Sequence, residues 1–175
     1  MRVLGVDPGT VATGWGVVDE DGSQIRFVAG GVFRAAGPLP QRLARIFAAA
    51  AEVLETFRPT SVSLEKSFVG DNVQSAFRLG EARGAILVAA ARADVPVSEY
   101  SPAEIKVAVA GQGRAAKEQM QLMVGRLLGL TDVLPTDEAD ALAAAICHLH
   151  TARFAAHVDR AVGTVGGGLP RPGRR

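Results

Sequence analysis

The chain has 175 residues, enough for one domain with a single sizeable core. Its composition, 48% hydrophobic and 21% charged, is ordinary for a globular protein, and no apolar run approaches the roughly 20 residues of a membrane span. The net charge of +1 means that any affinity for nucleic acid must come from a local cluster of cations. The lone Cys147 excludes an intrachain disulfide, so we expect a cytoplasmic protein. Because no apolar run is long enough to span a membrane, we expect no membrane contact.

The predicted elements begin with strands and end with helices. Three strands joined by short turns come first, at Arg2–Val6, Gly14–Asp19 and Gln24–Phe33. A helix, a strand, a second helix and a fifth strand follow, at Leu39–Phe57, Ser61–Leu64, Asp71–Arg92 and Pro96–Glu99. Three helices come last, at Ala103–Val109, Ala115–Leu128 and Thr136–Arg153. This order predicts a mixed α/β domain, in which an antiparallel unit precedes strand–helix alternation.

We expect residues 1–158 to form this domain and residues 159–175 to form a tail. The stretch from Arg160 to Arg175 contains four arginines, no acid, and many glycines and prolines. Such a composition cannot build a hydrophobic core, so it predicts a disordered basic segment.

Two of the predicted strands run directly into a carboxylate. Asp7 follows the first strand and precedes Pro8-Gly9, and ordinary turn chemistry is one explanation of an acid there. Glu65 ends a later strand in the same way, and a solvated acid at a strand end is its simple alternative. If both strands end at the same edge of one sheet, the two carboxylates lie close together.

A further pair of acids lies at the start of the last predicted helix. Asp137 and Asp140 are three residues apart and therefore share one helix face. Acids in a first turn usually complement the helix dipole, which explains Asp137 and Glu138 equally well. The face of Asp140 continues through alanines to Cys147, an apolar stripe that should point at the sheet. A carboxylate on such a stripe must be neutralised or paired.

A cluster of these carboxylates favours a divalent cation. No basic residue lies close enough in sequence to balance all of them, and hard oxygen ligands select Mg²⁺ or Mn²⁺ over zinc. The three histidines and the single cysteine do not have the spacing of a zinc site. The sequence therefore predicts a magnesium or manganese site.

Four blocks of the sequence resemble one known family. LGVDPGTVATGWGVV, LEKSFVGDNVQSAFRLGEARG, SPAEIKVAVAGQGRAAKEQMQ and DEADALAAAICH are similar, in order and at family spacing, to the RuvC family of Holliday-junction resolvases. The resemblance covers about residues 2–150. It implies a ribonuclease-H-like mixed sheet flanked by helices, and a nuclease domain over residues 1–158. It also implies a homodimer that resolves four-way DNA junctions by paired symmetric nicks.

The resemblance also implies the ligands of two divalent ions in each active site. Carried over residue by residue, these are Asp7, Glu65, Asp137 and Asp140. On this interpretation Asp7 bridges the ions, because it ends a rigid strand in the middle of the sheet. Glu65 and Asp140 each hold one ion, and Asp137, nearest the start of its helix, is the most replaceable of the four.

Lysine usage adds an independent signal. The 19 basic residues include only three lysines, and two of them, Lys106 and Lys117, fall within the family blocks. A compact ammonium can contact a phosphate without bidentate geometry. We assign Lys106 to binding of the junction backbone and Lys117 to binding and to charge on the scissile phosphate. Random placement on a solvated surface is the alternative.

Further DNA contacts are expected on the segment after Glu65. Phe68 lies in a polar loop, where an aromatic is as often a hydrophobic anchor as a ligand. The resemblance favours stacking on a base at the crossover. Arg78 and Arg83, on the following helix, are weaker candidates for phosphate contact.

The symmetry of the substrate predicts the assembly. Two symmetric nicks in a two-fold junction suit a C₂ homodimer. Gly80 and Gly84 are four residues apart and allow another helix to approach closely, although packing on the protein's own sheet explains them equally well. By the same resemblance, a branch-migration motor complex of the RuvA and RuvB type is an expected partner.

Three alternatives remain open. DPGT before a strand also resembles the phosphate-binding hairpin of actin-like and sugar-kinase ATPases, whose duplicated domains 175 residues cannot accommodate. A YqgF-type nuclease shares the first motif but is not expected to match the Phe68 loop or the block from Lys106 to Lys117. A non-catalytic junction binder would have substituted acids, and all four acids are present.

Overall fold

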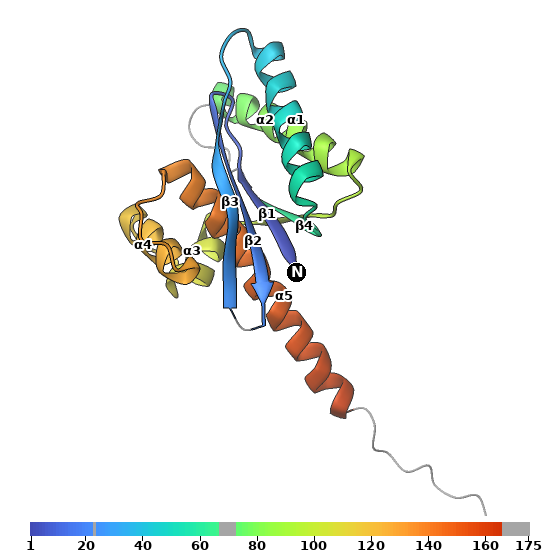
Figure 1. Ribbon diagram of the computed structural model, residues 1–175, viewed down its shortest axis with the longest axis vertical. Coiled ribbons are helices and arrows are strands. Elements are labelled where there is room, and N and C mark those ends of the chain that lie inside the picture. Colours follow the sequence, from blue (N-terminus) through green and yellow to red (C-terminus); the bar gives the residue numbers. More distant parts are fainter. Residues whose placement is uncertain (23, 67–72, 166–175) are drawn as a thin grey trace, which may run out of the picture.

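The computed structural model describes residues 1–22, 24–66 and 73–165, and side chains as far as residue 161. A five-stranded sheet with the order β3-β2-β1-β4-β5 forms its centre (Figure 1). The strands are β1 (Arg2–Asp7), β2 (Ala12–Asp21), β3 (Gln24–Arg34), β4 (Ser61–Glu65) and β5 (Val97–Tyr100). β1, β2 and β3 pair antiparallel, whereas β1 with β4 and β4 with β5 pair parallel. The expected antiparallel unit followed by strand–helix alternation is confirmed.

Helices cover both faces of the sheet (Figure 1). Their bounds are α1 (Leu39–Phe57), α2 (Val73–Arg92), α3 (Pro102–Ala110), α4 (Lys117–Leu128) and α5 (Thr136–Val165). We call the side covered by α3, α4 and α5 the α5 face and the opposite side the α1–α2 face. Each face has its own buried cluster, because successive strand residues point to opposite sides: Val3 packs on the α5 face, and Leu4 on the α1–α2 face.

Glycines let α5 lie unusually close to the sheet. A Cβ added to Gly5 would lie 1.9 Å from the carbonyl oxygen of Ala141, and one added to Gly14 would lie 1.8 Å from that of Asp137. Contacts this short exclude any side chain at these positions. A Cβ added to Gly16 or Gly30, two further glycines of the sheet, would lie 2.4 Å from a side-chain atom of the same helix. The sequence of the strands thus sets the height of α5 above the sheet.

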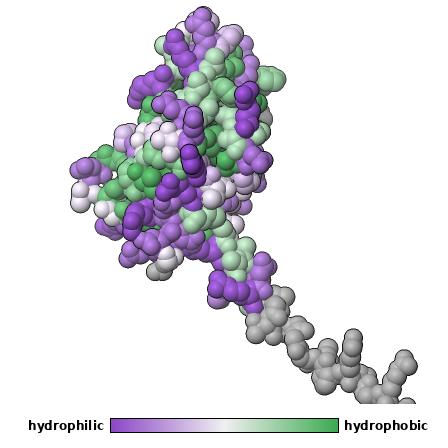
Figure 2. Space-filling view, turned by 45° about the vertical axis from the view of Figure 1, so that its right-hand side comes forward, coloured by the Kyte–Doolittle hydropathy of each residue, from purple (hydrophilic) through white to green (hydrophobic). Residues whose placement is uncertain are grey.

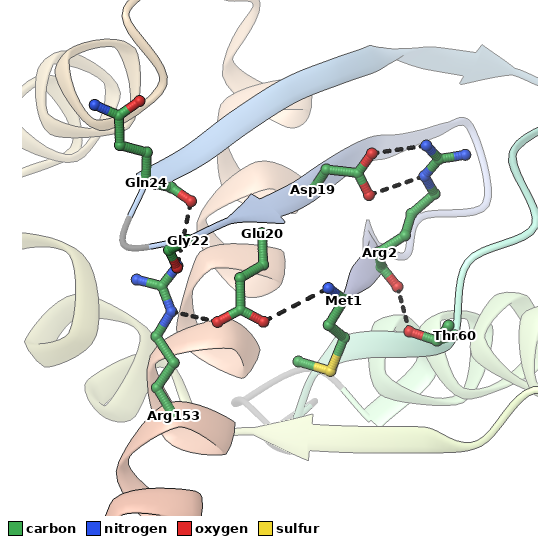
Figure 3. Close-up of polar contacts among 8 residues, drawn as sticks. All are labelled: Met1, Arg2, Asp19, Glu20, Gly22, Gln24, Thr60 and Arg153. Carbon is green, nitrogen blue, oxygen red and sulfur yellow. Dashed lines mark hydrogen bonds and ion pairs between the residues drawn. The ribbon is translucent and has the colours of Figure 1, made fainter.

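Arg153 fixes the other end of this contact, where α5 leaves the sheet (Figure 3). Its Nε donates to Glu20 at 2.6 Å, and its Nη2 donates to the carbonyl oxygens of Gly22 at 3.3 Å and Gln24 at 3.2 Å. Glu20 also pairs with the amino group of Met1 at 3.5 Å. The turn between β2 and β3 is therefore tied to α5 far from the end that carries the acids.

Most predicted boundaries agree with the structure to within two residues, but the last helix is longer than expected. It was expected to end at Arg153 and continues to Val165. Its apolar stripe stops with the core, whereas helix-forming residues continue until Gly163, so propensity extends the helix beyond its packing. The last part of α5 projects away from the sheet, and Figure 2 shows hydrophilic and hydrophobic residues mixed along it.

The extended helix passes through the start of the segment expected to be a tail. Residues 159–165 are helical, which corrects the expectation of disorder there, while residues 166–175 lie outside the described part of the chain. The division of the chain at residue 158 stays a prediction. Among the described residues, no helix combines the length and the apolar character needed to cross a bilayer.

Candidate active site

Two neighbouring parallel strands end in carboxylates at the same edge of the sheet. β1 and β4 pair with Val6 opposite Leu64, so that the last residue of each strand is an acid, Asp7 in β1 and Glu65 in β4. Both side chains are half-buried, and strand alternation directs them to the α5 face. The two acids expected to meet at one sheet edge do lie together there.

The first turns of α5 lie over this edge. Gly14 pairs with Asp7, and the backbone of Asp137 lies directly above Gly14. Asp140 follows one turn later, and both helix carboxylates are near enough to act electrostatically on Asp7. The close approach that the glycines permit therefore places the two acids of α5 beside the two strand-end acids.

A buried hydrogen bond sets the position of α5 along β4. The hydroxyl of Ser63, which is fully buried, donates to the carbonyl oxygen of Ala144 at 2.7 Å. Ser63 precedes Glu65 by two residues on the same strand face, and Ala144 follows Asp140 by one helical turn. This bond therefore holds Asp140 next to Glu65. The sequence analysis missed Ser63, and its one signal is a serine at an inward position of an apolar strand.

The turn behind Asp7 is held by a second buried hydroxyl. Thr13 has no exposed surface; its Oγ1 donates to the carbonyl oxygen of Gly9 at 2.7 Å and accepts from the Gly9 amide at 3.3 Å. A Cβ at Gly9 would lie 2.1 Å from the carbonyl oxygen of Ala12, so the turn needs glycine. The Pro8-Gly9 turn is thus a rigid support for Asp7. Thr13 was also missed from the sequence.

Burial and neighbouring carboxylates raise the pKa of the two acids at the strand ends. Burial is the largest cause, followed by repulsion from Asp140, Glu65 and Asp137, and together they raise the pKa of Asp7 to about 7. Burial, and then the charge of Asp140, also raise the pKa of Glu65. Because Asp140, Glu65 and Asp137 all act on Asp7, the four acids form one electrostatic cluster.

Two lysines lie next to this cluster. The ammonium of Lys117, the first residue of α4, pairs with Asp140 at 3.4 Å and lowers the pKa of both Asp7 and Glu65. Lys106 on α3 also lowers the pKa of Glu65. Both lysines line a cleft of about 270 Å³ together with Glu65, Pro102, Ile105, Met120, Asp140 and Ala143. The cleft therefore joins the acids to both lysines selected from the sequence.

The donor set fits a hard divalent cation. The acids offer only carboxylate oxygens, and a cation would relieve the repulsion that raises the pKa of Asp7. In the described part of the chain, no three His, Cys, Asp or Glu side chains stand close enough to hold one ion together. Asp140 is instead paired with Lys117, so binding an ion requires the carboxylates to rotate toward one another.

The remaining sequence-predicted residues lie elsewhere. Phe68 is outside the described residues. Arg78 is exposed on α2 and does not line the cleft. Arg83 turns inward: its Nη1 donates to the carbonyl oxygen of Glu65 at 2.8 Å, its guanidinium pairs with Glu99, and only 14% of its side chain is exposed. A phosphate contact by Arg83, as expected from the sequence, does not fit this arrangement.

A mixed five-stranded sheet with acids at the ends of β1 and β4, flanked by helices, belongs to the ribonuclease-H-like α/β class. The yeast mitochondrial Holliday junction resolvase Ydc2 shares the fold with a TM-score of 0.69 at 14% identity, over 93% of this chain and 83% of that chain. The structure of Thermus thermophilus RuvC in complex with Holliday junction substrate matches with a TM-score of 0.85 at 43% identity. That match covers 89% of this chain and 96% of that chain.

Sequence comparison gives the same result. A crossover junction endodeoxyribonuclease RuvC of Azoarcus sp. (strain BH72) is 49% identical over 150 residues, which are 85% of this chain and 82% of that protein. The family model described as crossover junction endodeoxyribonuclease RuvC matches residues 3–148. The chain belongs to the RuvC family of crossover junction endodeoxyribonucleases, as its motifs predicted. These are hydrolytic nucleases for which dependence on a divalent metal is typical, and the ATPase and YqgF-type alternatives are set aside.

Proposed function

We propose that this chain cuts four-way DNA junctions by two symmetric nicks, using two divalent ions held by Asp7, Glu65, Asp137 and Asp140. The observation that carries this proposal is the electrostatic cluster at the ends of β1 and β4. Three carboxylates raise the pKa of a fourth there, and two cationic side chains line the same cleft. The size of the cleft suits a phosphodiester group, and membership of the RuvC family supplies the substrate class.

We assign a role to each acid from the strand or helix that carries it. Asp7, at the end of a central strand and backed by the rigid Pro8-Gly9 turn, would bridge the two ions. Glu65 and Asp140, held near each other by the hydrogen bond from Ser63 to Ala144, would each bind one ion. Asp137 lies in the first turn of α5 and is the most replaceable of the four. When bound, the ions supply an activated water and stabilise the leaving oxygen of an in-line phosphodiester hydrolysis.

The lysines act on the phosphates. Lys117, now paired with Asp140, is free to turn to the scissile phosphate once the acids hold cations, because its side chain is 58% exposed. Lys106, which lines the same cleft, contacts the junction backbone. Arg78 on the exposed side of α2 is proposed as a further phosphate contact. Phe68 is proposed to stack on a base at the crossover.

Both ions are proposed to be Mg²⁺ or Mn²⁺, because the four ligands present carboxylate oxygens and no sulfur or imidazole. We also propose that the protein works in the cytoplasm. Cys147 is buried and unpaired, which suits a reducing compartment.

A homodimer is proposed to form through the outer side of α2. Val73, Phe77 and Val88 are exposed there by 58%, 70% and 53%, and a Cβ at Gly80 or Gly84 would meet nothing within 4 Å. The spacing of these residues places them along one side of the helix, where they form an apolar stripe open to a second copy. A two-fold dimer presents two active sites to a two-fold junction. A branch-migration motor complex of the RuvA and RuvB type is proposed as a further partner.

Cleavage of a synthetic four-way junction tests the proposal. With Mg²⁺ or Mn²⁺ we expect two nicks at symmetry-related positions, and no nicks in a linear duplex of equal length. Binding without cleavage under either metal would identify a non-catalytic junction binder. Equal cleavage of junction and duplex would identify a general metal-dependent nuclease instead.

A further inference from the structure

Arg83 reaches from α2 to the end of the strand that carries Glu65. Its neighbours Ala82 and Ile86 are buried in the cluster of the α1–α2 face, so this part of α2 is firmly packed. From that base the Arg83 side chain donates Nη1 to the carbonyl oxygen of Glu65 at 2.8 Å, while its Nη2 pairs with Glu99 of β5. One guanidinium therefore joins α2, β4 and β5.

The peptide group that Arg83 contacts lies at the end of β4, where pairing with β1 has already ended. The pairing of β4 with β1 ends at Leu64, opposite Val6. Beyond it, β5 holds the chain on one side, where the amide of Lys66 donates to the carbonyl oxygen of Tyr100 at 2.7 Å. Arg83 provides a contact to the Glu65 carbonyl from the adjacent helix. Without it, among the residues that the structure describes, only β5 would hold the backbone at this end of β4.

We propose that Arg83, oriented by Glu99, is a positioning residue that fixes the backbone of Glu65 and thereby the place of its carboxylate among the four acids. This inference rests on the proposed metal-dependent function. Arg83 touches neither the cleft nor its contents, since it lies on the α1–α2 face while the Glu65 side chain points to the α5 face. It acts on the site through a single peptide group.

The geometry requires an arginine. A guanidinium presents several donors in a planar fork, so it can bind the carbonyl and the carboxylate at once. Lysine, with one ammonium on a flexible stem, cannot reproduce that fixed pair of directions. Glu99 is 39% exposed and its carboxylate stays in contact with solvent, so its pairing with the 14% exposed Arg83 contributes less to overall stability than a fully buried ion pair would. Loss of the pair should therefore be seen mainly at the metal site rather than in the fold.

The test compares Arg83→Gln, Arg83→Lys and Glu99→Gln with a matched control. Arg92→Gln removes the same charge from the same helix, where the guanidinium lies 5.9 Å from the centre of the Phe47 ring, away from the cleft. For each variant, the melting temperature is measured without metal and during titration with Mn²⁺. The half-point of the Mn²⁺-induced rise reports metal binding without catalysis. Single-turnover cleavage of a four-way junction is measured in parallel.

Arg83→Gln should raise the Mn²⁺ concentration at the half-point by about tenfold or more, the usual scale for losing a group that orients a ligand. Arg83→Lys should fall between this variant and the wild type, and Glu99→Gln should shift the half-point in the same direction by less. The cleavage rate should recover at high Mn²⁺. Arg92→Gln should match the wild type in both measurements.

An unchanged half-point in both Arg83→Gln and Glu99→Gln overturns the inference, as does a fall in metal-free melting temperature with no change in metal dependence. If Arg83→Gln does not fold, Glu99→Gln decides, because it keeps the arginine. If the wild type binds Mn²⁺ but cuts no junction, only the proposed function is contradicted. The Mn²⁺ titration of the variants still tests the positioning role of Arg83. If Mn²⁺ does not change the melting temperature of the wild type, both the proposed function and the positioning role of Arg83 are contradicted.

Discussion

The two faces of the sheet are built on different principles. The α1–α2 face is packed with large apolar side chains such as Leu4, Ile46 and Leu54. On the α5 face, by contrast, glycines bring a helix backbone against the sheet, and the buried hydroxyl of Ser63 bonds that backbone at Ala144. The first arrangement tolerates shifts of side chains at modest cost, whereas the second specifies backbone positions. A site that needs four carboxylates in a defined arrangement lies on the second face.

The largest expected effect comes from Asp7, the acid that ends the central strand β1 on the α5 face. Asp7→Asn removes one charge and one ligand but leaves the strand and the Pro8-Gly9 turn in place. Junction binding should persist, while cleavage should fall below about one-hundredth of the wild-type rate, because the proposed bridging ligand is lost. Binding assays without divalent metal and single-turnover cleavage with Mg²⁺ measure the two effects. Cleavage above that level would contradict the bridging role.

A pair of substitutions, one on each face, tests the comparison directly. Gly5→Ala would place a methyl group 1.9 Å from the carbonyl oxygen of Ala141 and force α5 away from β1. We expect a loss of ~1–3 kcal/mol in the free energy of unfolding and a roughly 10- to 100-fold fall in cleavage, because displaced acids no longer share their ions.

Leu54→Ala is the matched change on the α1–α2 face. It leaves a cavity in the apolar cluster and should cost ~2–5 kcal/mol, at least as much as Gly5→Ala. Cleavage by the folded protein should nevertheless stay close to the wild-type rate. Urea unfolding and cleavage at a temperature where both variants are folded provide the measurement. Equal loss of cleavage in both variants would show that the faces do not differ in this respect.

Local signals in the sequence predicted much of the fold and of the acid cluster. Asp7 and Glu65 were found because each directly follows an apolar strand, and Asp140 because it lies on an otherwise apolar helix stripe. Such patterns depend on a few neighbouring residues. They also gave the antiparallel unit and its change to strand–helix alternation.

The parts that the sequence did not predict depend on distant residues meeting. The hydrogen bond of Ser63 joins it to Ala144, 81 positions away, and exists only because α5 crosses β4 at one register. Arg83 was predicted to face phosphate, since nothing in its own helix indicates that it turns inward to Glu65. The end of α5 was placed too early because packing and helix propensity end at different residues.

The charge on the α5 face should make the metal-free protein sensitive to pH. Burial and the neighbouring acids raise the pKa of Asp7 from 3.8 to about 7, so between these values the folded state holds a proton that the unfolded state releases. Stability falls with rising pH wherever the native state holds more protons. The contribution is therefore fully present below about pH 4 and is lost as the pH rises through about 7.

Melting temperatures between pH 4 and pH 8 check this, with and without Mn²⁺. A bound cation replaces the proton, so saturating Mn²⁺ should remove most of the decline. Asp7→Asn should show a weaker decline without metal, because the raised pKa values of Glu65 and Glu138 remain. A metal-free wild type whose decline equals that of Asp7→Asn would show that the pKa of Asp7 is not raised.

The smallest expected effect concerns the cations at the rim of the α5 face. Because the net charge is only +1, attraction to phosphate depends on a few side chains, and Lys106 lines the cleft beside Glu65. Lys106→Ala should weaken junction binding and reduce the slope of log affinity against log salt by about one unit, the value of one lost phosphate contact. Arg92→Ala removes the same charge far from the cleft and should leave the slope unchanged. If Lys106→Ala keeps the full slope, or if the wild type binds a linear duplex as tightly as a junction, the cleft does not select the junction.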